Sequence, residues 1–280
     1  MQKSIDKAVV NFSVGIIGCG WLGKALAINL LEKGMSVLAT SSKQVNVDKL
    51  NQQGINAQQL ILPALSKQLM QHDIFTQQSL VIAVTPQFKQ GRTDYADKIA
   101  QLVNAAQQRG VVQRIILLST TGVYQGLQGN VDEESTLNLA IEKVAIINAA
   151  EQSVLNYTKH SNVIRLAGLL GPERHPGKFI LANKTLTNSM APVNLIHQQD
   201  AVGLIESLLK VNSPQGIFNG VSDTHVSKQQ YYQVAATALS HQPPVFSKED
   251  TNELHKVVSG DKAKHVLNYK FIYPDLLTWL

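Results

Sequence analysis

The chain has 280 residues, of which 44% are hydrophobic and 16% charged, a balance typical of a globular protein with a large buried core. Its formal charge of +5 comes from 25 Lys and Arg residues scattered among 20 Asp and Glu residues, so no basic stripe predicts a nucleic-acid partner. The single cysteine, Cys19, excludes an intramolecular disulfide and the usual zinc sites, and no stretch approaches 18 apolar residues. We therefore expect a cytoplasmic protein with no metal site and no membrane partner.

The first half of the chain alternates β-rich runs with helical patterns. Residues 13–17 predict a strand, residues 21–33 a helix that ends before Gly34, and residues 36–40 a second strand, which together make a βαβ unit. Further strands are predicted at 57–62, 80–84, 114–118 and 162–167. These runs are too apolar for a sheet with one face in water, so we expect central parallel strands.

Two long helical patterns separate the later strands. Apolar residues recur at helical spacing from Tyr95 to Ala106, and the pattern stops at Gly110, a residue suited to a helix C-terminus. The second pattern covers residues 137–156. The alternation of strands and helices predicts an α/β fold with an open, doubly wound parallel sheet.

The regular alternation ends after about residue 168, where GLLGPERHPGKF is rich in glycine, proline and charge. Residues 200–210 predict a helix with Asp200 as its N-cap, and the tail contains another amphipathic helix. We divide the chain into two parts. Residues 1–168 form the main domain, to which 194–221 return, and residues 169–193 and 222–280 form a small C-terminal α/β lobe on the substrate side.

A glycine motif follows the first strand and opens the first helix. In GCGWLG, Gly18, Gly20 and Gly23 have the spacing of a dinucleotide-binding loop, with Trp21 and Leu22 between the last two glycines. The first glycine permits the turn, the second allows a pyrophosphate to approach the backbone, and the third lets the helix pack on the strand. We predict dinucleotide binding, the alternative being a structural turn between strand and helix.

The end of the second strand distinguishes the two nicotinamide dinucleotides. An acidic residue there binds the ribose 2′-hydroxyl of NAD, whereas the 2′-phosphate of NADP needs hydrogen-bond donors and a cation. The strand ends in Thr40, Ser41, Ser42 and Lys43, without a carboxylate. This favours NADP(H) over NAD(H), although these residues are equally compatible with an ordinary loop.

Three further stretches carry a family resemblance. They are LLSTTGVYQG at 117–126, VIRLAGLLGPERHPG at 163–177 and VNLIHQQDAVGLI at 193–205. With the glycine loop, they make the chain similar to extended and atypical short-chain dehydrogenase/reductases of the NAD-dependent epimerase/dehydratase type, in particular to the subgroup of bacterial YeeZ-like proteins. The resemblance implies a Rossmann-type domain, an NAD(P) cofactor, a small-molecule substrate and a homodimer formed through helices near 93–109 and 137–156.

The resemblance also implies roles for single residues. Thr120 matches the catalytic hydroxyl of the family, and Tyr124 matches the tyrosine of its Val-Tyr-Gly element, next to the substrate. Thr85, Pro86 and Ser119 are expected to line the cofactor cleft, and Arg174 and His175 to meet an anionic substrate. A different interpretation of Thr120 is that it only bonds backbone groups in a turn.

The proton donor of the family is missing. No tyrosine of the chain is followed by a lysine four residues later, and alignment on Glu151 puts Lys143 at the tyrosine position and Ile147 at the lysine position. We therefore predict an NADP(H)-binding protein without ordinary turnover. Two alternatives stay open, an oxidoreductase or epimerase on a nucleotide-sugar-like substrate that uses Thr120 with Lys143 or His175, and a noncatalytic NADP(H) sensor.

Two further residues have structural interpretations. His197 is expected to be a packed, hydrogen-bonded histidine rather than a general base. Cys19 is expected to be a small packing residue rather than a nucleophile, because no histidine lies near it in sequence.

Overall fold

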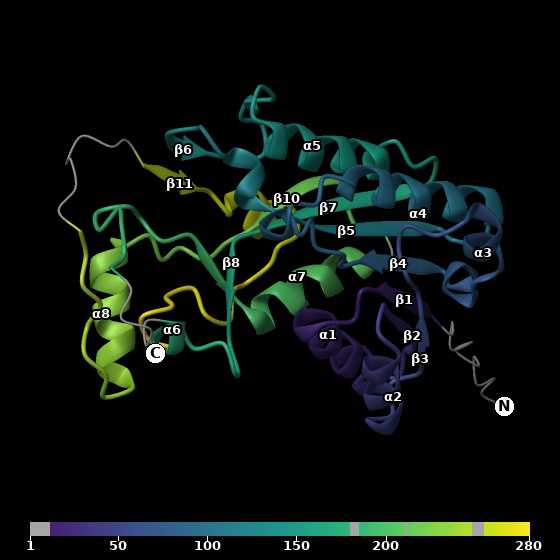
Figure 1. Ribbon diagram of the computed structural model, residues 1–280, viewed down its shortest axis with the longest axis horizontal. Helices are drawn as coiled ribbons and strands as arrows, with labels where there is room; N and C mark the ends of the chain where they lie inside the picture. Colours follow the sequence, from purple (N-terminus) through teal and green to yellow (C-terminus); the bar gives the residue numbers. More distant parts are fainter. Residues whose placement is uncertain (1–11, 180–184, 211, 248–254) are drawn as a thin grey trace, which may run out of the picture.

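The computed structural model describes residues 12–179, 185–210, 212–247 and 255–280. Its centre is a seven-stranded sheet in the order β10-β7-β5-β4-β1-β2-β3 (Figure 1). The strands are β1 (Ser13–Ile17), β2 (Ser36–Ser41), β3 (Ala57–Gln59), β4 (Ser79–Ile82), β5 (Arg114–Thr120), β7 (His160–Leu166) and β10 (Gly216–Gly220). All neighbouring strands are parallel, which confirms the predicted doubly wound α/β sheet of Rossmann type.

Helices cover both faces of this sheet. The helices of the first face are α1 (Trp21–Glu32), α2 (Gln44–Gln52) and α7 (Gln198–Leu209), and those of the second face are α3 (Ser66–Gln71), α4 (Tyr95–Arg109) and α5 (Glu142–Leu155). In β5, Ile116 and Leu118 belong to the first apolar cluster, while Ile115 and Leu117 belong to the second. Because successive side chains of a strand point to opposite faces, one apolar run supplies both cores.

Some predicted boundaries are wrong. The helix predicted at 137–156 begins at Glu142, because Asn138 closes a turn in which its side-chain oxygen accepts from the Ala140 amide. The helix predicted to begin at Asp200 begins at Gln198, and its N-cap is His197. The strand predicted at 57–62 ends at Gln59. The first two shifts occur where local hydrogen bonds of Asn138 and His197, rather than apolar periodicity, set the start of a helix.

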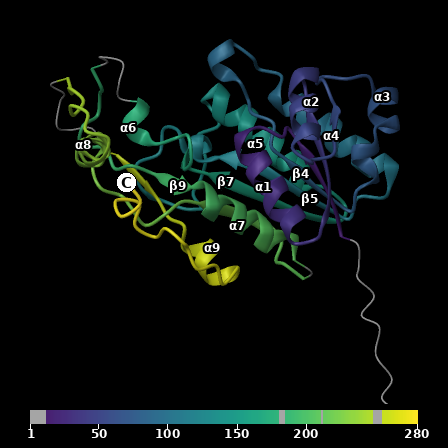
Figure 2. The same cartoon turned by 90° about the horizontal axis from the view of Figure 1, so that it is seen from below.

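The other elements lie at one end of the sheet (Figures 1 and 2). They comprise two small parallel sheets, β8 (Gly168–Leu170) with β9 (Leu195–His197) and β6 (Gly129–Val131) with β11 (Lys256–Val258), and the helices α6 (Pro176–Phe179), α8 (Lys228–Ala238) and α9 (Asp261–Val266). Short 3₁₀ helices occur at η1 (Asp73–Thr76), η2 (Phe88–Gln90) and η3 (Thr121–Tyr124). Within the described ranges, no helix is both long and apolar enough to cross a membrane.

The C-terminal segment holds the small end together. Leu276 lies with Leu170, Val193 and Tyr231 in an apolar cluster. Asp200, fully buried in α7, accepts hydrogen bonds from the backbone amides of Ile272 and Tyr273 and from the Tyr269 hydroxyl. Asp200 therefore anchors this segment, which corrects its predicted role as an N-cap. Within the two predicted parts, residues 1–11, 180–184, 211 and 248–254 lie outside the described residues.

Candidate functional site

A cleft of about 800 Å³ lies where β1, β4, β5 and β7 end. The sheet order reverses between β1 and β4, and ligands of open α/β sheets bind at such a switch point, outside the carboxyl ends of the strands. Eleven of the predicted site residues line this cleft: Gly18, Gly20, Trp21, Leu22, Gly23, Thr85, Pro86, Ser119, Thr120, Lys143 and Arg174. Segments far apart in sequence thus meet at one site.

The glycine loop has the shape that a pyrophosphate requires. Gly18 has a φ of +91°, and a Cβ there would lie 3.0 Å from the Ala83 carbonyl oxygen. A Cβ on Gly23 would lie 3.1 Å from the Gly18 oxygen, whereas one on Gly20 would meet nothing within 4 Å. The space over Gly20 is therefore open at the N-terminus of the twelve-residue helix α1, where amides and the helix dipole favour a phosphate.

At the end of β2, one polar side chain is buried and the two that follow the strand are exposed. Thr40 is buried, its hydroxyl accepts from the Gly18 amide, and its carbonyl accepts from the Cys19 amide. The prediction that Thr40 contacts the cofactor is therefore corrected, because its polar atoms hold the glycine loop. Ser42 and Lys43 are exposed just before α2, whose first turn has no acidic residue.

Ser119 and Thr120 present opposite hydrogen-bonding properties to the cleft. The Ser119 hydroxyl donates its hydrogen to Glu151 at 2.5 Å, so its free lone pairs can only accept. The Thr120 oxygen accepts from the Gly122 amide at 3.0 Å, which leaves its hydrogen available to donate into the cleft. Thr120 thus both caps η3 and lines the cleft.

Behind Ser119 lies a buried ion pair. Glu151 in α5 is fully buried and accepts from the Arg165 guanidinium in β7, with a shortest distance of 2.7 Å. Arg165 also donates to the Tyr124 hydroxyl at 2.9 Å. Tyr124 is completely buried, so its predicted contact with substrate is corrected to a place in the interior.

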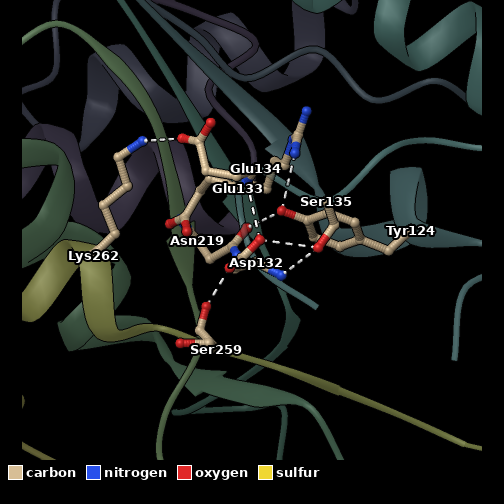
Figure 3. Close-up of polar contacts among 9 residues, drawn as sticks. Tyr124, Asp132, Glu133, Glu134, Ser135, Asn219, Ser259 and Lys262 are labelled. Atoms are coloured by element: carbon tan, nitrogen blue, oxygen red, sulfur yellow. Dashed lines mark hydrogen bonds and ion pairs between the residues drawn. The ribbon is translucent and has the colours of Figure 1, made fainter. Parts of the chain in front are cut away.

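Tyr124 continues this network toward the small sheets (Figure 3). Its hydroxyl donates to the side-chain oxygen of Asn219 at 2.8 Å, and Asn219 in turn donates to the Ser259 carbonyl. The backbone amide of Asn219 donates to the Glu133 carboxylate at 2.6 Å. Burial raises the pKa of Glu133. The network therefore joins β5, β7 and β10 to the loop after β6 and the segment after β11.

The first turns of α5 bring two side chains to the cleft. Lys143 and Ile147, one helical turn apart, both line it. These are the positions that the resemblance assigns to the tyrosine and lysine of the family.

The loop between β8 and α6 meets the glycine loop. The Arg174 guanidinium stacks on the Trp21 ring at 4.3 Å, and the Trp21 indole N–H donates to the Pro172 carbonyl at 3.0 Å. His175 does not line the cleft. Its Nδ1 accepts from the Gly177 amide and its ring packs on Trp279, so the predicted substrate contact of His175 is corrected to a structural role.

His197 and Cys19 are both buried. His197 caps α7 by accepting from the Gln199 amide, packs against Tyr273 and Trp279, and has its pKa lowered to about 4 by burial. Burial raises the pKa of the Cys19 thiol to about 11, which keeps it protonated and unreactive at neutral pH. Their structural interpretations match this geometry.

Several residues that line the cleft were not predicted from the sequence. They are Phe88, Lys89 and Gln90 in η2, Tyr95 at the start of α4, Gln125 after η3, and Leu169 in β8. Tyr95 was recognised only as part of a helical apolar pattern. The signal that could have located the η2 residues is their position after a central parallel strand, since such loops border the ligand in this class of sheet.

Comparison with known proteins gives the family. Residues 18–194 match the family described as NAD(P)H-binding. Protein YeeZ of Escherichia coli K12 is 31% identical to the chain over 268 residues, which cover 94% of this chain and 97% of YeeZ.

Solved structures share the fold at lower identity. A putative NAD-dependent epimerase/dehydratase from Methylobacillus flagellatus superposes with a TM-score of 0.76 at 19% identity and covers 96% of both chains. The human epimerase family protein SDR39U1, solved with NADPH, superposes with a TM-score of 0.72 at 15% identity. The match covers 95% of this chain and 96% of SDR39U1. MoeE5, solved with UDP-glucose and NAD, superposes with a TM-score of 0.74 at 17% identity, and the match covers 92% of this chain and 93% of MoeE5.

Proposed function

The chain belongs to the NAD(P)H-binding family, and from this we propose that it is an atypical, epimerase/dehydratase-like NADP(H)-dependent oxidoreductase in which Thr120 and Lys143 replace the usual Tyr-Lys pair. The observation that carries the proposal is that both residues face the cleft that the glycine loop borders. A hydroxyl donor and a proton-bearing ammonium in one cleft are the groups that reduction of a carbonyl requires.

The residues of the cleft fit a dinucleotide. The open space above Gly20 and the amides at the start of α1 suit the pyrophosphate, while Ser42 and Lys43 at the end of β2 suit a 2′-phosphate. When bound, the cofactor supplies a hydride to a carbonyl carbon or accepts one from an alcohol carbon.

Thr120 and Lys143 would complete the reaction. The free hydrogen of the Thr120 hydroxyl can be donated to a substrate carbonyl oxygen and stabilise the negative charge that grows there. The Lys143 ammonium can give that oxygen a proton during reduction, and the resulting amine can take the proton back during oxidation. Ile147, beside Lys143, adds apolar surface that helps to exclude water from the reacting atoms.

Further properties belong to this proposal. Residues 1–168 with 194–221 act as the cofactor-binding domain, and residues 169–193 with 222–280 act as the lobe that faces the substrate. The protein works in the cytoplasm as a homodimer through α4 and α5. Support for the dimer is that these two helices pack side by side on one face of the sheet (Figure 1).

The test is NADPH oxidation measured with a panel of carbonyl compounds. We expect Thr120→Val and Lys143→Ala each to lower kcat by about 10² or more, as loss of a positioned donor or acid does, with the NADPH affinity unchanged. Lys67→Ala, on the exposed surface of α3, is the matched control for Lys143→Ala.

Two outcomes would contradict this proposal. Tight NADPH binding without turnover on any compound would favour a noncatalytic sensor, in agreement with the missing Tyr-Lys pair. Turnover that both variants leave unchanged would place the chemistry on other residues.

A further inference from the structure

The lining of the cleft carries an unbalanced positive charge. Lys89 from η2, Lys143 from α5 and Arg174 from the loop between β8 and α6 all line it, whereas none of the described residues that line it is Asp or Glu. No carboxylate of the described chain lies within ion-pair distance of any of the three. Three unpaired cations around one cavity repel one another, and a bound anion would relieve that repulsion.

The Arg174 side chain is exposed, and its guanidinium is held against the ring of Trp21. Its guanidinium lies 4.3 Å from the centre of the Trp21 ring, and Trp21 is fixed by its hydrogen bond to the Pro172 carbonyl. A stacked guanidinium keeps its N–H groups available at its edges, in the fork arrangement that matches a carboxylate or a phosphate. Arg174 is thus preorganised to bind an anion.

The phosphates of the cofactor have other partners. The glycine loop and α1 suit the pyrophosphate, and Ser42 with Lys43 suits the 2′-phosphate. Lys89 comes from η2 and Arg174 from the loop between β8 and α6, so neither belongs to the glycine loop, to α1 or to the end of β2. Their charge is therefore left for a second ligand.

The cleft volume limits the size of that ligand. The cleft measures about 800 Å³. Pockets for one drug-sized ligand span about 300 to 1,000 Å³, and a dinucleotide is already larger than most such ligands. The space left beside the cofactor suits a small molecule better than a second nucleotide.

We propose that the substrate is a small oxoacid, a carbonyl compound that carries a carboxylate or a phosphate, and that Lys89 and Arg174 hold its anionic group. This rests on the proposed oxidoreductase function. In the reduction, hydride from NADPH forms the new C–H bond, the C=O π bond breaks, and Lys143 gives its proton to the oxygen. The products are a hydroxyacid and NADP⁺.

The test compares charged and neutral probes of similar shape on the NADP⁺-loaded protein by isothermal titration calorimetry. One arm uses 2-oxobutyrate against butanone and the other uses dihydroxyacetone phosphate against dihydroxyacetone, so that a carboxylate and a phosphate are tested separately. We expect the charged member of at least one pair to bind about tenfold or more tightly, and this advantage to shrink as salt increases.

Variants assign that advantage to the two cations. Lys89→Gln and Arg174→Gln should each remove most of the charged probe's advantage, while Lys67→Gln, an exposed lysine outside the cleft, should leave it intact. NADPH affinity is measured first on every variant. If the wild type does not bind NADPH, the proposed function is refuted. If it binds NADPH, the probe affinities test the substrate proposal alone.

Three results would overturn the inference. The first is equal binding of charged and neutral probes. The second is an Arg174→Gln variant that loses NADPH affinity instead of probe affinity, since Arg174 would then serve the cofactor. The third is UDP-glucose binding tighter than every small acid, which would restore a nucleotide-sugar substrate.

Discussion

Lys43 is the cation that we expect to distinguish NADPH from NADH. It is exposed at the junction of β2 and α2, next to the exposed Ser42, and α2 has no acidic residue in its first turn. A 2′-phosphate at this junction would gain the ammonium charge and the positive end of the helix dipole, neither of which a 2′-hydroxyl needs. The preference for NADPH should therefore depend on this residue.

We predict that Lys43→Glu weakens NADPH binding by about tenfold to a hundredfold and leaves NADH binding nearly unchanged, because the new carboxylate repels the phosphate. Nicotinamide fluorescence titration measures both affinities. Lys49→Glu makes the same charge change on an exposed position of α2 and should have little effect. Equal losses for NADPH and NADH would contradict the assignment of Lys43 to the 2′-phosphate.

Arg165 and Glu151 form a buried ion pair, and removing either side chain should destabilise the folded protein. Both are almost completely buried, and Arg165 also holds the Tyr124 hydroxyl, while Glu151 orients Ser119. Removing one partner of a buried pair leaves an uncompensated charge, whereas replacing both with apolar residues can be nearly neutral. The pair therefore fixes the positions of the side chains at the floor of the cleft.

Arg165→Met should lower the free energy of unfolding by about 3 to 5 kcal/mol, because Glu151 would stay buried and unpaired. The double variant with Glu151→Leu should be clearly more stable than Arg165→Met alone. Urea denaturation followed by circular dichroism measures both. Strictly additive losses in the double variant would show that the two side chains do not act as a pair.

Helix α7 begins with a histidine cap that must be neutral. The His197 Nδ1 accepts from the Gln199 amide, and the ring is packed between aromatic side chains with its pKa lowered to about 4. A base whose folded pKa lies below its unfolded value of about 6.5 contributes its full stability above pH 6.5. That contribution is lost as the pH falls toward 4, because the unfolded chain takes up the proton more readily.

The pH dependence gives a direct test of this cap. Relative to His197→Asn, which can cap but does not titrate in this range, the wild type should lose about 2 kcal/mol of unfolding free energy between pH 7 and pH 5. Urea unfolding of both proteins at the two pH values measures the difference. A difference between the proteins that stays constant with pH would mean that His197 is not held neutral.

The whole chain presents α4 and α5 side by side along one face of the sheet (Figure 1). Ala149 is exposed on α5, and a small residue there would let a partner helix approach closely. At the other end of the molecule, the C-terminal segment is tied to α7 through Asp200. The proposal thus assigns the subunit contact to this face of the sheet and the substrate lobe to the end that contains the C-terminal segment.

We predict that size-exclusion chromatography with light scattering gives twice the mass of one chain, and that Ala149→Arg shifts the protein to a monomer because its bulk and charge prevent helix contact. Ala238→Arg, the same change at an exposed position of α8, should leave the dimer intact. A wild-type monomer, or disruption by both variants alike, would exclude this interface.

The sequence alone determined the central sheet and the cofactor loop. The apolar runs of β1, β4, β5 and β7 require burial on both faces, which only a parallel sheet covered by helices provides. The glycine spacing of the loop is equally local, because a positive φ at Gly18 and the close approach of Gly23 to the strand both depend on backbone geometry within six residues.

Only the tertiary structure decided which polar side chains face the cleft. Thr40, Tyr124 and His175 were predicted to bind ligand but point into the interior, whereas Lys89 and Tyr95 line the cleft without having been predicted. Periodicity fixes the direction of a side chain inside a strand or helix. At strand ends and in loops, that direction depends on hydrogen-bond partners far away in sequence, such as Asn219 for Tyr124, and the fold has to form before such partners meet.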